Sequence, residues 1–293
     1  MQPEYTERLL HPKMEYYREC YKESERWDGE SDLNGKTVII YGEQGYGDII
    51  QFIRYVPLLK QKYECNIILH IPACLHSIIK GLDGEYTCID KNENLNMPNH
   101  DYHIPSMSLP FLLGTYIGDN SYLKITEKEN LPDFQDCFKI GVAWEGNPNH
   151  SNNYDRCCPL GVFRKLHDMP KTKLFMIQPN IHNEQLIEGS NDLELYGIEL
   201  KDFKSTARLL NSMDIVVSVD TAVMHLAGAL GKRTYCLLSH NHDTRWDLNI
   251  DWYPTVKFIK QKKAGDWLGI SSEIGMHVEM DRQKWFINHS VKS

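Results

Sequence analysis

The residues best suited to chemistry lie in two turns, each of which follows a predicted strand and begins a predicted helix. The first turn is Gly45-Tyr46-Gly47-Asp48, and the second is Asp220-Thr221-Ala222-Val223-Met224-His225. Each turn places backbone N–H groups and a polar side chain at the positive end of a helix, where a phosphate or a developing alkoxide can be held. Two such turns in separate halves of the chain predict a cleft enzyme, with a nucleotide-linked substrate on one wall and an acceptor on the other.

Asp48 is the candidate general base. Gly45 and Gly47 let the backbone turn tightly, and with Gln44 they form a loop that leaves the carboxylate reachable. A carboxylate there could accept a proton from an acceptor hydroxyl, and general-base work needs that reach before it needs a tuned pKa. The alternative is an aspartate that only satisfies a backbone N–H group at the start of the helix.

The second turn predicts a phosphate site. Asp220 could cap the helix, and Thr221 could give its hydroxyl and N–H group to a phosphate. His225 follows one helical turn beyond Thr221 and is expected on the same side. Ala222 and the small residues further along keep the helix slim, so that its start can lie close to a bulky ligand. The alternative is a capped core helix with a buried histidine.

A third cluster follows the first strand of the second half. Arg156 is always charged and can bind a diphosphate with both arms of its guanidinium, while Asn147 and His150 offer neutral polar contacts. Gln178 ends a further predicted strand and could read a ribose or a base. A solvated loop and an exposed glutamine are the alternatives. The run His240–Asp243 has no separate carboxylate cluster at ligand spacing, so we expect no metal there.

The elements that must position these residues form two α/β domains. Residues 4–27 are charged and tyrosine-rich, and we expect one or two helices on the outside of the first domain. The helix after the first turn has an apolar period of about 3.6 residues, and Pro57 is expected to kink it or end it. Alternation of strands and helices predicts parallel sheets covered on both faces. We expect strands at 37–41, 66–71, 86–89, 100–104, 137–144, 173–178, 214–219, 234–238 and 256–259, and helices at 73–81, 106–116, 160–167, 203–212 and 222–230.

A polar stretch at 127–136, which contains Pro132, is the predicted linker. It separates an N-terminal domain of residues 1–130, expected on the acceptor side with 1–34 as a helical lead-in, from a C-terminal domain of residues 137–293, expected to bind the nucleotide-linked substrate. The final segment, residues 265–289, is expected to serve in packing, with the first domain as one candidate surface.

Length and composition limit the classes of function. A chain of 293 residues fits roughly two domains of about 150 residues. The net charge of −8 and the pI near 5.9 argue against binding nucleic acid or an anionic membrane by bulk electrostatics. The eight cysteines include no C-x-x-C pair, so we expect reduced thiols. We find neither an apolar leader nor a run near the roughly 18 apolar residues of a membrane span, and we expect a soluble, cytoplasmic protein.

Motifs along most of the chain resemble one family. The segments Trp27–Gly29, Leu33–Thr37, Glu43–Tyr55, Gly141–Pro148, Ser218–Lys232 and Gly265–Trp267 run in the same order as in bacterial heptosyltransferase-like glycosyltransferases. The likeness is strongest to the branch often found after tetratricopeptide repeats, and it covers nearly the whole chain from Trp27 onward. Only about one helical hairpin precedes Trp27 here, Glu145 replaces a small residue, and Cys157 replaces a common serine.

The resemblance implies a GT-B fold, in which two doubly wound Rossmann-like domains face each other across a cleft. It also implies metal-independent, inverting transfer of a sugar from a nucleoside diphosphate sugar to a hydroxyl of a glycan, lipid-linked or protein acceptor, with no cofactor. Asp48 matches the family's general base. Asp220, Thr221 and His225 match the element that binds the donor diphosphate, and Arg156 could supply a basic phosphate contact. The alternatives are a catalytically silent sugar-nucleotide or glycan-binding module and a nucleotide-sugar epimerase.

Overall fold

The computed structural model divides into two units. One comprises residues 1–117 with 122–124, and the other comprises residues 118–121 with 125–293. Part of the predicted linker is bound to the second unit, because Asn211 Nδ2 donates to the carbonyls of Ile125 at 2.6 Å and Glu127 at 3.1 Å. The residues that the structure describes are 7–92, 97–118, 121–131, 134, 136–148, 153–178, 193–248 and 250–290.

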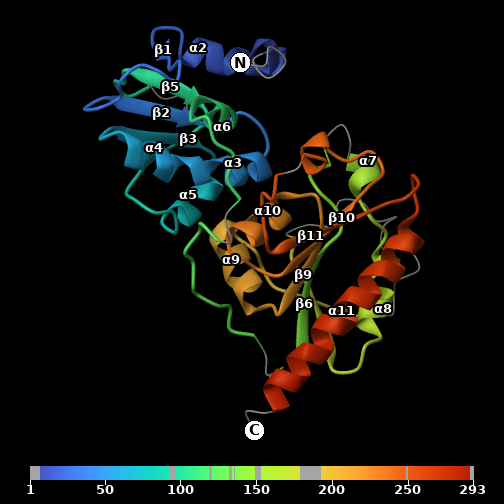
Figure 1. The fold of residues 1–293 in the computed structure, drawn as a ribbon. Coiled ribbons are helices and arrows are strands. Elements are labelled where there is room, and N and C mark those ends of the chain that lie inside the picture. The colour runs from blue at the N-terminus through green and yellow to red at the C-terminus, as the bar shows by residue number, and fades with distance from the viewer. Residues whose placement is uncertain are drawn as a thin grey trace. The chain divides into compact units, whose positions relative to one another are not determined.

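A five-stranded parallel sheet forms the centre of the first unit, with the strand order β1-β5-β2-β3-β4 (Figure 1). The chain passes from β2 to β3 on one side and later returns to β5 on the other side of β2. The carboxyl ends of β2 and β5 therefore form a topological switch point, where open α/β sheets bind ligands. The strands are β1 (Glu25–Arg26), β2 (Thr37–Tyr41), β3 (Asn66–Ile71), β4 (Thr87–Asp90) and β5 (Tyr102–Pro105).

The helix predicted after the first glycine turn is interrupted. A 3-10 turn at Ile53–Tyr55 separates α3 from α4. Pro57 lies in the first turn of α4, where its missing N–H group costs no helical hydrogen bond. The proline therefore begins a new helix after the first one has ended. The helices of this unit that follow β2 are α3 (Tyr46–Phe52), α4 (Val56–Lys62), α5 (Ala73–Ile79) and α6 (Leu109–Leu112).

The N-terminal segment, residues 7–24, packs on this sheet through aromatic side chains. Its helix α2 (Glu15–Cys20) is shorter than the sequence pattern indicates. The ring of Tyr17 stacks on that of Tyr41 with 4.6 Å between centroids, and Tyr21 stacks on Tyr41 at 4.9 Å. These rings join Leu9 and Met14 in a small buried cluster, which holds the segment against the first unit.

The second unit contains a six-stranded parallel sheet with the order β11-β10-β9-β6-β7-β8. The chain builds β6, β7 and β8 in one direction and β9, β10 and β11 in the other. This is the strand order of a doubly wound dinucleotide-binding sheet, and its switch point lies between β6 and β9. The strands are β6 (Phe138–Ala143), β7 (Thr172–Met176), β8 (Leu195–Gly197), β9 (Ile215–Val219), β10 (Thr234–Leu238) and β11 (Val256–Lys260).

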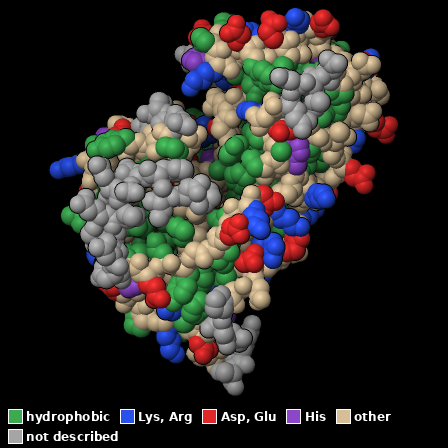
Figure 2. All heavy atoms as spheres, turned by 180° about the vertical axis from the view of Figure 1, so that it is seen from behind, with side chains coloured by type: hydrophobic (Ala, Val, Ile, Leu, Met, Phe, Trp, Pro, Cys, Tyr) green, Lys and Arg blue, Asp and Glu red, His purple; other side chains and the backbone are tan. Residues whose placement is uncertain are grey.

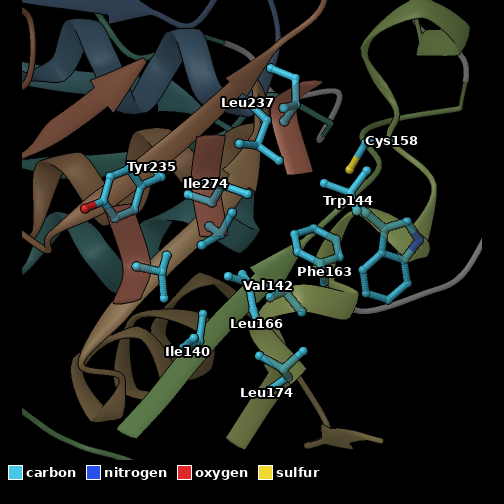
Figure 3. Packing of buried hydrophobic residues seen from close by; sticks show 14 of the residues in the cluster. Ile140, Val142, Trp144, Cys158, Phe163, Leu166, Leu174, Tyr235, Leu237 and Ile274 are labelled. Atoms are coloured by element: carbon cyan, nitrogen blue, oxygen red, sulfur yellow. The ribbon is translucent and has the colours of Figure 1, made fainter. Parts of the chain in front are cut away.

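Alternate residues of β6 point into the core of this unit. Ile140 and Val142 pack with Phe163, Leu166 and Ile274, and all five are inaccessible to solvent (Figure 3). Burying a side chain of this size stabilises the fold by about 1.5–3 kcal/mol. The cluster therefore fixes β6, and with it the start of the loop that follows.

Helices cover both faces of the second sheet (Figure 1). α9 (Phe203–Ser212) and α10 (Ala222–Ala229) lie on one face, and α8 (Arg164–His167) and α11 (Trp267–Ser290) lie on the other. The final segment is thus a helix whose buried side chains belong to the core of the second unit. Those side chains include Ile270, Ile274 and Val278.

The surface carries charges of both signs. On the face that Figure 2 shows, Lys and Arg side chains are interspersed with Asp and Glu side chains. No helix in the described part of the chain is long and apolar enough to cross a membrane. The short elements without a predicted counterpart include β1, in the stretch where only helices were expected, β8, and the helix α7 (Asn153–Arg156).

Candidate functional site

The candidate donor site is built at the carboxyl ends of β6 and β9 in the second unit. The loop after β6 carries Asn147, and α7 carries Arg156. The turn after β9 carries Asp220 and Thr221 and leads directly into α10. Because β6 and β9 are neighbouring parallel strands, their following loops meet at the switch point. The fold thus brings together residues that lie far apart in the sequence.

The start of α10 presents backbone N–H groups. Thr221 is the N-cap residue, with an extended φ of −141°, and no side chain caps the helix. The prediction that Asp220 caps this helix is therefore wrong, since its side chain is directed to another partner. Thr221 and Ala222, both half-buried, border the helix start. The positive end of the helix dipole and N–H groups there can accept an anion.

Asp220 accepts a hydrogen bond of 2.8 Å from Nε1 of Trp246. Its other oxygen lies 3.7 Å from Nε2 of His225. Burial raises the pKa of the Asp220 carboxyl, and the Trp246 hydrogen bond opposes that rise. A carboxylate held in this way can orient neighbouring groups without facing a phosphate itself.

His225 is buried on α10, with Tyr253 at one ring nitrogen and the Asp220 carboxylate 3.7 Å from the other. Its Nδ1 lies 2.9 Å from the hydroxyl of Tyr253, and its ring lies beside that of Trp246 at 5.5 Å between centroids. Gly228 leaves room for Tyr253, because a Cβ there would lie 2.4 Å from the tyrosine ring. Tyr253 and Trp246 are not among the site residues predicted from the sequence. Neither residue has a local pattern that identifies its partner.

Arg156 lies over the turn after β9. Its Nη1 donates to the carbonyl of Asp220 at 3.3 Å, and its Nε donates to Asn153 Oδ1 at 3.3 Å. The guanidinium lies against Gly146, where an added Cβ would approach Nη2 to 2.2 Å. The structure therefore brings a permanent cation close to the start of α10, as a diphosphate site requires.

Gln178 holds the loop after β6 in place. Its Oε1 accepts hydrogen bonds from the backbone N–H of Trp144 at 3.0 Å and of Glu145 at 3.4 Å, while its Nε2 donates to the Glu145 carboxylate at 3.0 Å. With only 5% of its surface exposed, Gln178 is buried. The expectation that it reads a ribose or a base is not supported by these contacts, because its amide serves the loop. Asn147, in contrast, is exposed.

The first glycine turn lies at the carboxyl end of β2 in the first unit. Gly45 is the N-cap residue of α3, and Asp48 Oδ2 accepts a hydrogen bond of 3.1 Å from the Gly45 N–H. The Asp48 carboxylate thus satisfies a backbone N–H group at the start of the helix, as the structural alternative for this residue expects. Asp48 and Gly47 remain half-buried, and Gln44 is exposed, so the turn is open to solvent.

Two expectations concern other polar residues. His150 lies outside the described residues. His242, from the run considered for a metal, bonds Asp247 at 3.0 Å through Nε2. Across the described ranges, no group of three His, Cys, Asp or Glu side chains is placed to hold a metal ion.

Comparisons with known proteins identify the fold. Residues 184–259 match the model of glycosyltransferase family 9 (heptosyltransferase). The glycosyl transferase family 9 structure from Veillonella parvula superposes with a TM-score of 0.60 at 13% identity, covering 87% of this chain and 99% of that one. The iron-containing heptosyltransferase TibC of enterotoxigenic E. coli, in complex with ADP-D-beta-D-heptose, superposes with a TM-score of 0.54 at 12% identity. The match covers 81% of this chain and 66% of the TibC chain.

A curated relative is Protein FlbA of Caulobacter vibrioides, 22% identical over 275 residues. This chain spans 46% of FlbA, and the match covers 83% of this chain. The predicted α/β class and the GT-B type of fold are confirmed, as is the resemblance to heptosyltransferase-like proteins. The association with tetratricopeptide repeats stays a prediction.

Proposed function

We propose that this chain, whose residues 184–259 match glycosyltransferase family 9 (heptosyltransferase), transfers a sugar from a nucleoside diphosphate sugar to an acceptor hydroxyl. The observation that carries the proposal is the arrangement at the switch point of the second unit. There the open start of α10 and the Arg156 guanidinium lie together, next to the linked side chains of Asp220, Trp246 and His225. This set suits a diphosphate, which needs positive charge without a competing free carboxylate.

The donor is proposed to be held by its diphosphate. Thr221 and the N–H groups at the start of α10 would bind one phosphate, and Arg156 would bind the other. TibC, whose fold is similar, was crystallised with ADP-D-beta-D-heptose, which supports an ADP-sugar as the first donor to test. When the bond between sugar and diphosphate breaks, these groups would stabilise the charge that develops on the leaving diphosphate.

Asp48 is proposed to act as the general base in an inverting reaction. It would accept the proton of the acceptor hydroxyl while that oxygen forms the new bond to the sugar. The amide oxygen of an asparagine at this position could still accept the hydrogen bond from the Gly45 N–H, so Asp48→Asn is expected to preserve the turn. We expect this variant to lose transfer by at least about 100-fold, in line with the size of general-base effects, and to bind donor normally.

Metal independence is part of the proposal, since Arg156 and the start of α10 supply positive charge at the diphosphate. TibC is described as iron-containing, so the point needs its own test. We expect transfer to continue after EDTA treatment of the protein, with metal content checked by elemental analysis. Activity that disappears with EDTA and returns with one metal ion would overturn this part.

The test combines binding and transfer. Calorimetry with ADP-, GDP-, UDP- and CDP-sugars identifies the donor class, and a panel of glycan acceptors is then assayed for product with the anomeric configuration determined by NMR. His225→Ala should weaken donor binding, whereas the exposed Asp251→Asn should change neither binding nor transfer. Donor binding without transfer or hydrolysis would indicate a silent sugar-nucleotide-binding module. Interconversion of the donor without an acceptor would indicate an epimerase.

A further inference from the structure

A pocket of about 230 Å³ lies in the first unit, between the N-terminal segment and the sheet. We call it the Tyr41 pocket. The Tyr41 ring stacks with the rings of both Tyr17 and Tyr21, and the side chains of Leu9 and Met14 add apolar surface to the wall. None of the residues assigned to donor or acceptor chemistry above lines it. The pocket is therefore separate from the proposed roles of Asp48 and of the second unit.

One polar group in this wall has no partner. Tyr17 donates its hydroxyl to the carbonyl of Gly42, and the hydroxyl of Tyr21 lies 2.6 Å from Nδ1 of His70. The hydroxyl of Tyr41 has no hydrogen-bond partner among the described residues, although only 4% of the Tyr41 surface is exposed. A hydroxyl without a protein partner at the wall of a pocket can donate a hydrogen bond to a ligand, and that bond would stabilise the bound ligand.

The lining is basic. Arg18 and Arg26 both line the pocket, and its lining contains no acidic residue among those the structure describes. Arg18 donates through Nη1 to the carbonyl of Leu9 at 2.8 Å, whereas Arg26 makes no hydrogen bond or ion pair through its side chain within the described part of the chain. In a chain with a net charge of −8, a small basic pocket is selective for anions.

The charge of Arg26 acts on the groups around the pocket. Burial raises the pKa of Tyr41, the charge of Glu43 adds to that rise, and the charges of Arg26 and Arg8 oppose it. Burial also lowers the pKa of His103, another lining residue, to about 4, with the charges of His100 and Arg26 adding to the effect. His103 is therefore neutral near pH 7, and the positive charge of the lining comes from the two arginines.

We propose that the Tyr41 pocket binds a small organic anion, with one six-membered ring and a carboxylate, through Arg26 and the Tyr41 hydroxyl. Pockets for drug-sized ligands have volumes of about 300–1,000 Å³, so this smaller volume suits a single ring. The tyrosine and aliphatic walls provide apolar contact for the ring. A guanidinium matches the geometry of a carboxylate, and the Tyr41 hydroxyl adds a second donor to the same lining.

The ring can be a sugar or an aromatic ring, and the experiment distinguishes the two. Binding of glucuronate and of benzoate to the full chain is measured by ligand-observed NMR and calorimetry, without any nucleotide sugar. Glucose and benzyl alcohol serve as neutral counterparts. We expect one of the two carboxylates to bind at least about tenfold more tightly than its neutral counterpart, which corresponds to about 1.4 kcal/mol. Because no donor is present, the result does not depend on glycosyl transfer.

Two variants locate the site. Arg26→Gln removes an exposed charge that has no partner in the described structure, and Tyr41→Phe keeps the stacked ring, so both are expected to fold. Each should weaken binding of the carboxylate by about tenfold or more. Lys22→Gln, which removes a positive charge outside the lining, should bind like the wild type. Equal affinity for charged and neutral ligands, no saturable binding of either carboxylate, or unchanged binding in Arg26→Gln would each overturn the proposal.

Discussion

Nε1 of Trp246 donates a 2.8 Å hydrogen bond to the carboxylate of Asp220, although the two residues are 26 positions apart in the chain. The ring of Trp246 also lies near the rings of His225 and Phe258, at 5.5 Å and 4.7 Å between centroids. One side chain therefore links the turn after β9, the helix α10 and the strand β11. The candidate donor site depends on this link as much as on its own motif residues.

Trp246→Phe should separate the hydrogen bond from the ring packing. Asp220 then keeps its position without its donor, and we expect the free energy of unfolding to fall by about 1–3 kcal/mol in urea titrations. Since burial raises the pKa of Asp220, protonation at acidic pH relieves the unpaired charge, and the loss should be larger at pH 8 than at pH 4. Trp285→Phe, which removes a hydrogen bond to the Asp214 carboxylate, is the control. It should leave nucleotide binding unchanged.

Gly228→Ala tests whether the position of Tyr253, which bonds to His225, is needed for stability and for nucleotide binding. The new Cβ would lie 2.4 Å from the fully buried ring of Tyr253, which cannot yield without losing its bond to His225. We expect a loss of about 1–3 kcal/mol in unfolding free energy and weaker nucleotide binding by calorimetry. Gly161→Ala places its Cβ in open space and should be close to neutral. Equal stability of the two variants would contradict the packing argument.

The strands could be predicted because parallel strands buried on both faces are continuous apolar runs. Ile215–Val219 and Thr234–Leu238 are fully buried, and both appear in the sequence as short runs of mostly apolar residues. The ends of the helices could be predicted less accurately than the strands. At 160–167, for example, a 3-10 turn precedes α8, and such a turn has nearly the same spacing of apolar residues as an α-helix.

The partners of the site residues could not be predicted in the same way. Thr221 and Arg156 could be proposed from the sequence because a polar turn between a strand and a helix, and a basic residue in a loop, have local signatures. Gln178 was assigned to the ligand, but its amide binds the loop at Trp144 and Glu145. Such contacts join residues that are distant in the chain, and the periodicity of a sequence does not contain them.

Gly146→Ala should move Arg156 without unfolding the protein. The Cβ would lie 2.2 Å from Nη2 of Arg156, but that atom is the end of a flexible side chain and can shift. We therefore expect the free energy of unfolding to change by less than about 0.5 kcal/mol. If Arg156 binds the diphosphate, its displacement should weaken ADP binding by about tenfold in calorimetry. Wild-type affinity in Gly146→Ala, together with lost affinity in Arg156→Gln, would show that the loop adapts.

Acid sensitivity should come in part from His70 in the first unit. His70 is inaccessible to solvent, and burial lowers its pKa from the ordinary 6.5 to about 4, with the charge of Lys91 adding to the effect. Between pH 6.5 and 4 the unfolded chain therefore binds a proton that the folded chain excludes, so stability falls as the pH falls through this range. Above that range the group makes no such contribution.

His70→Gln keeps an acceptor for the Tyr21 hydroxyl but does not titrate. We expect its melting temperature to fall less steeply than that of the wild type between pH 6.5 and 4, even if its melting temperature at pH 8 is lower. His289→Gln, at an exposed site on α11, should keep the wild-type slope. Parallel curves for wild type and His70→Gln would mean that His70 accepts its proton without loss of structure, and that the hydrogen bond with Tyr21 does not require the neutral imidazole.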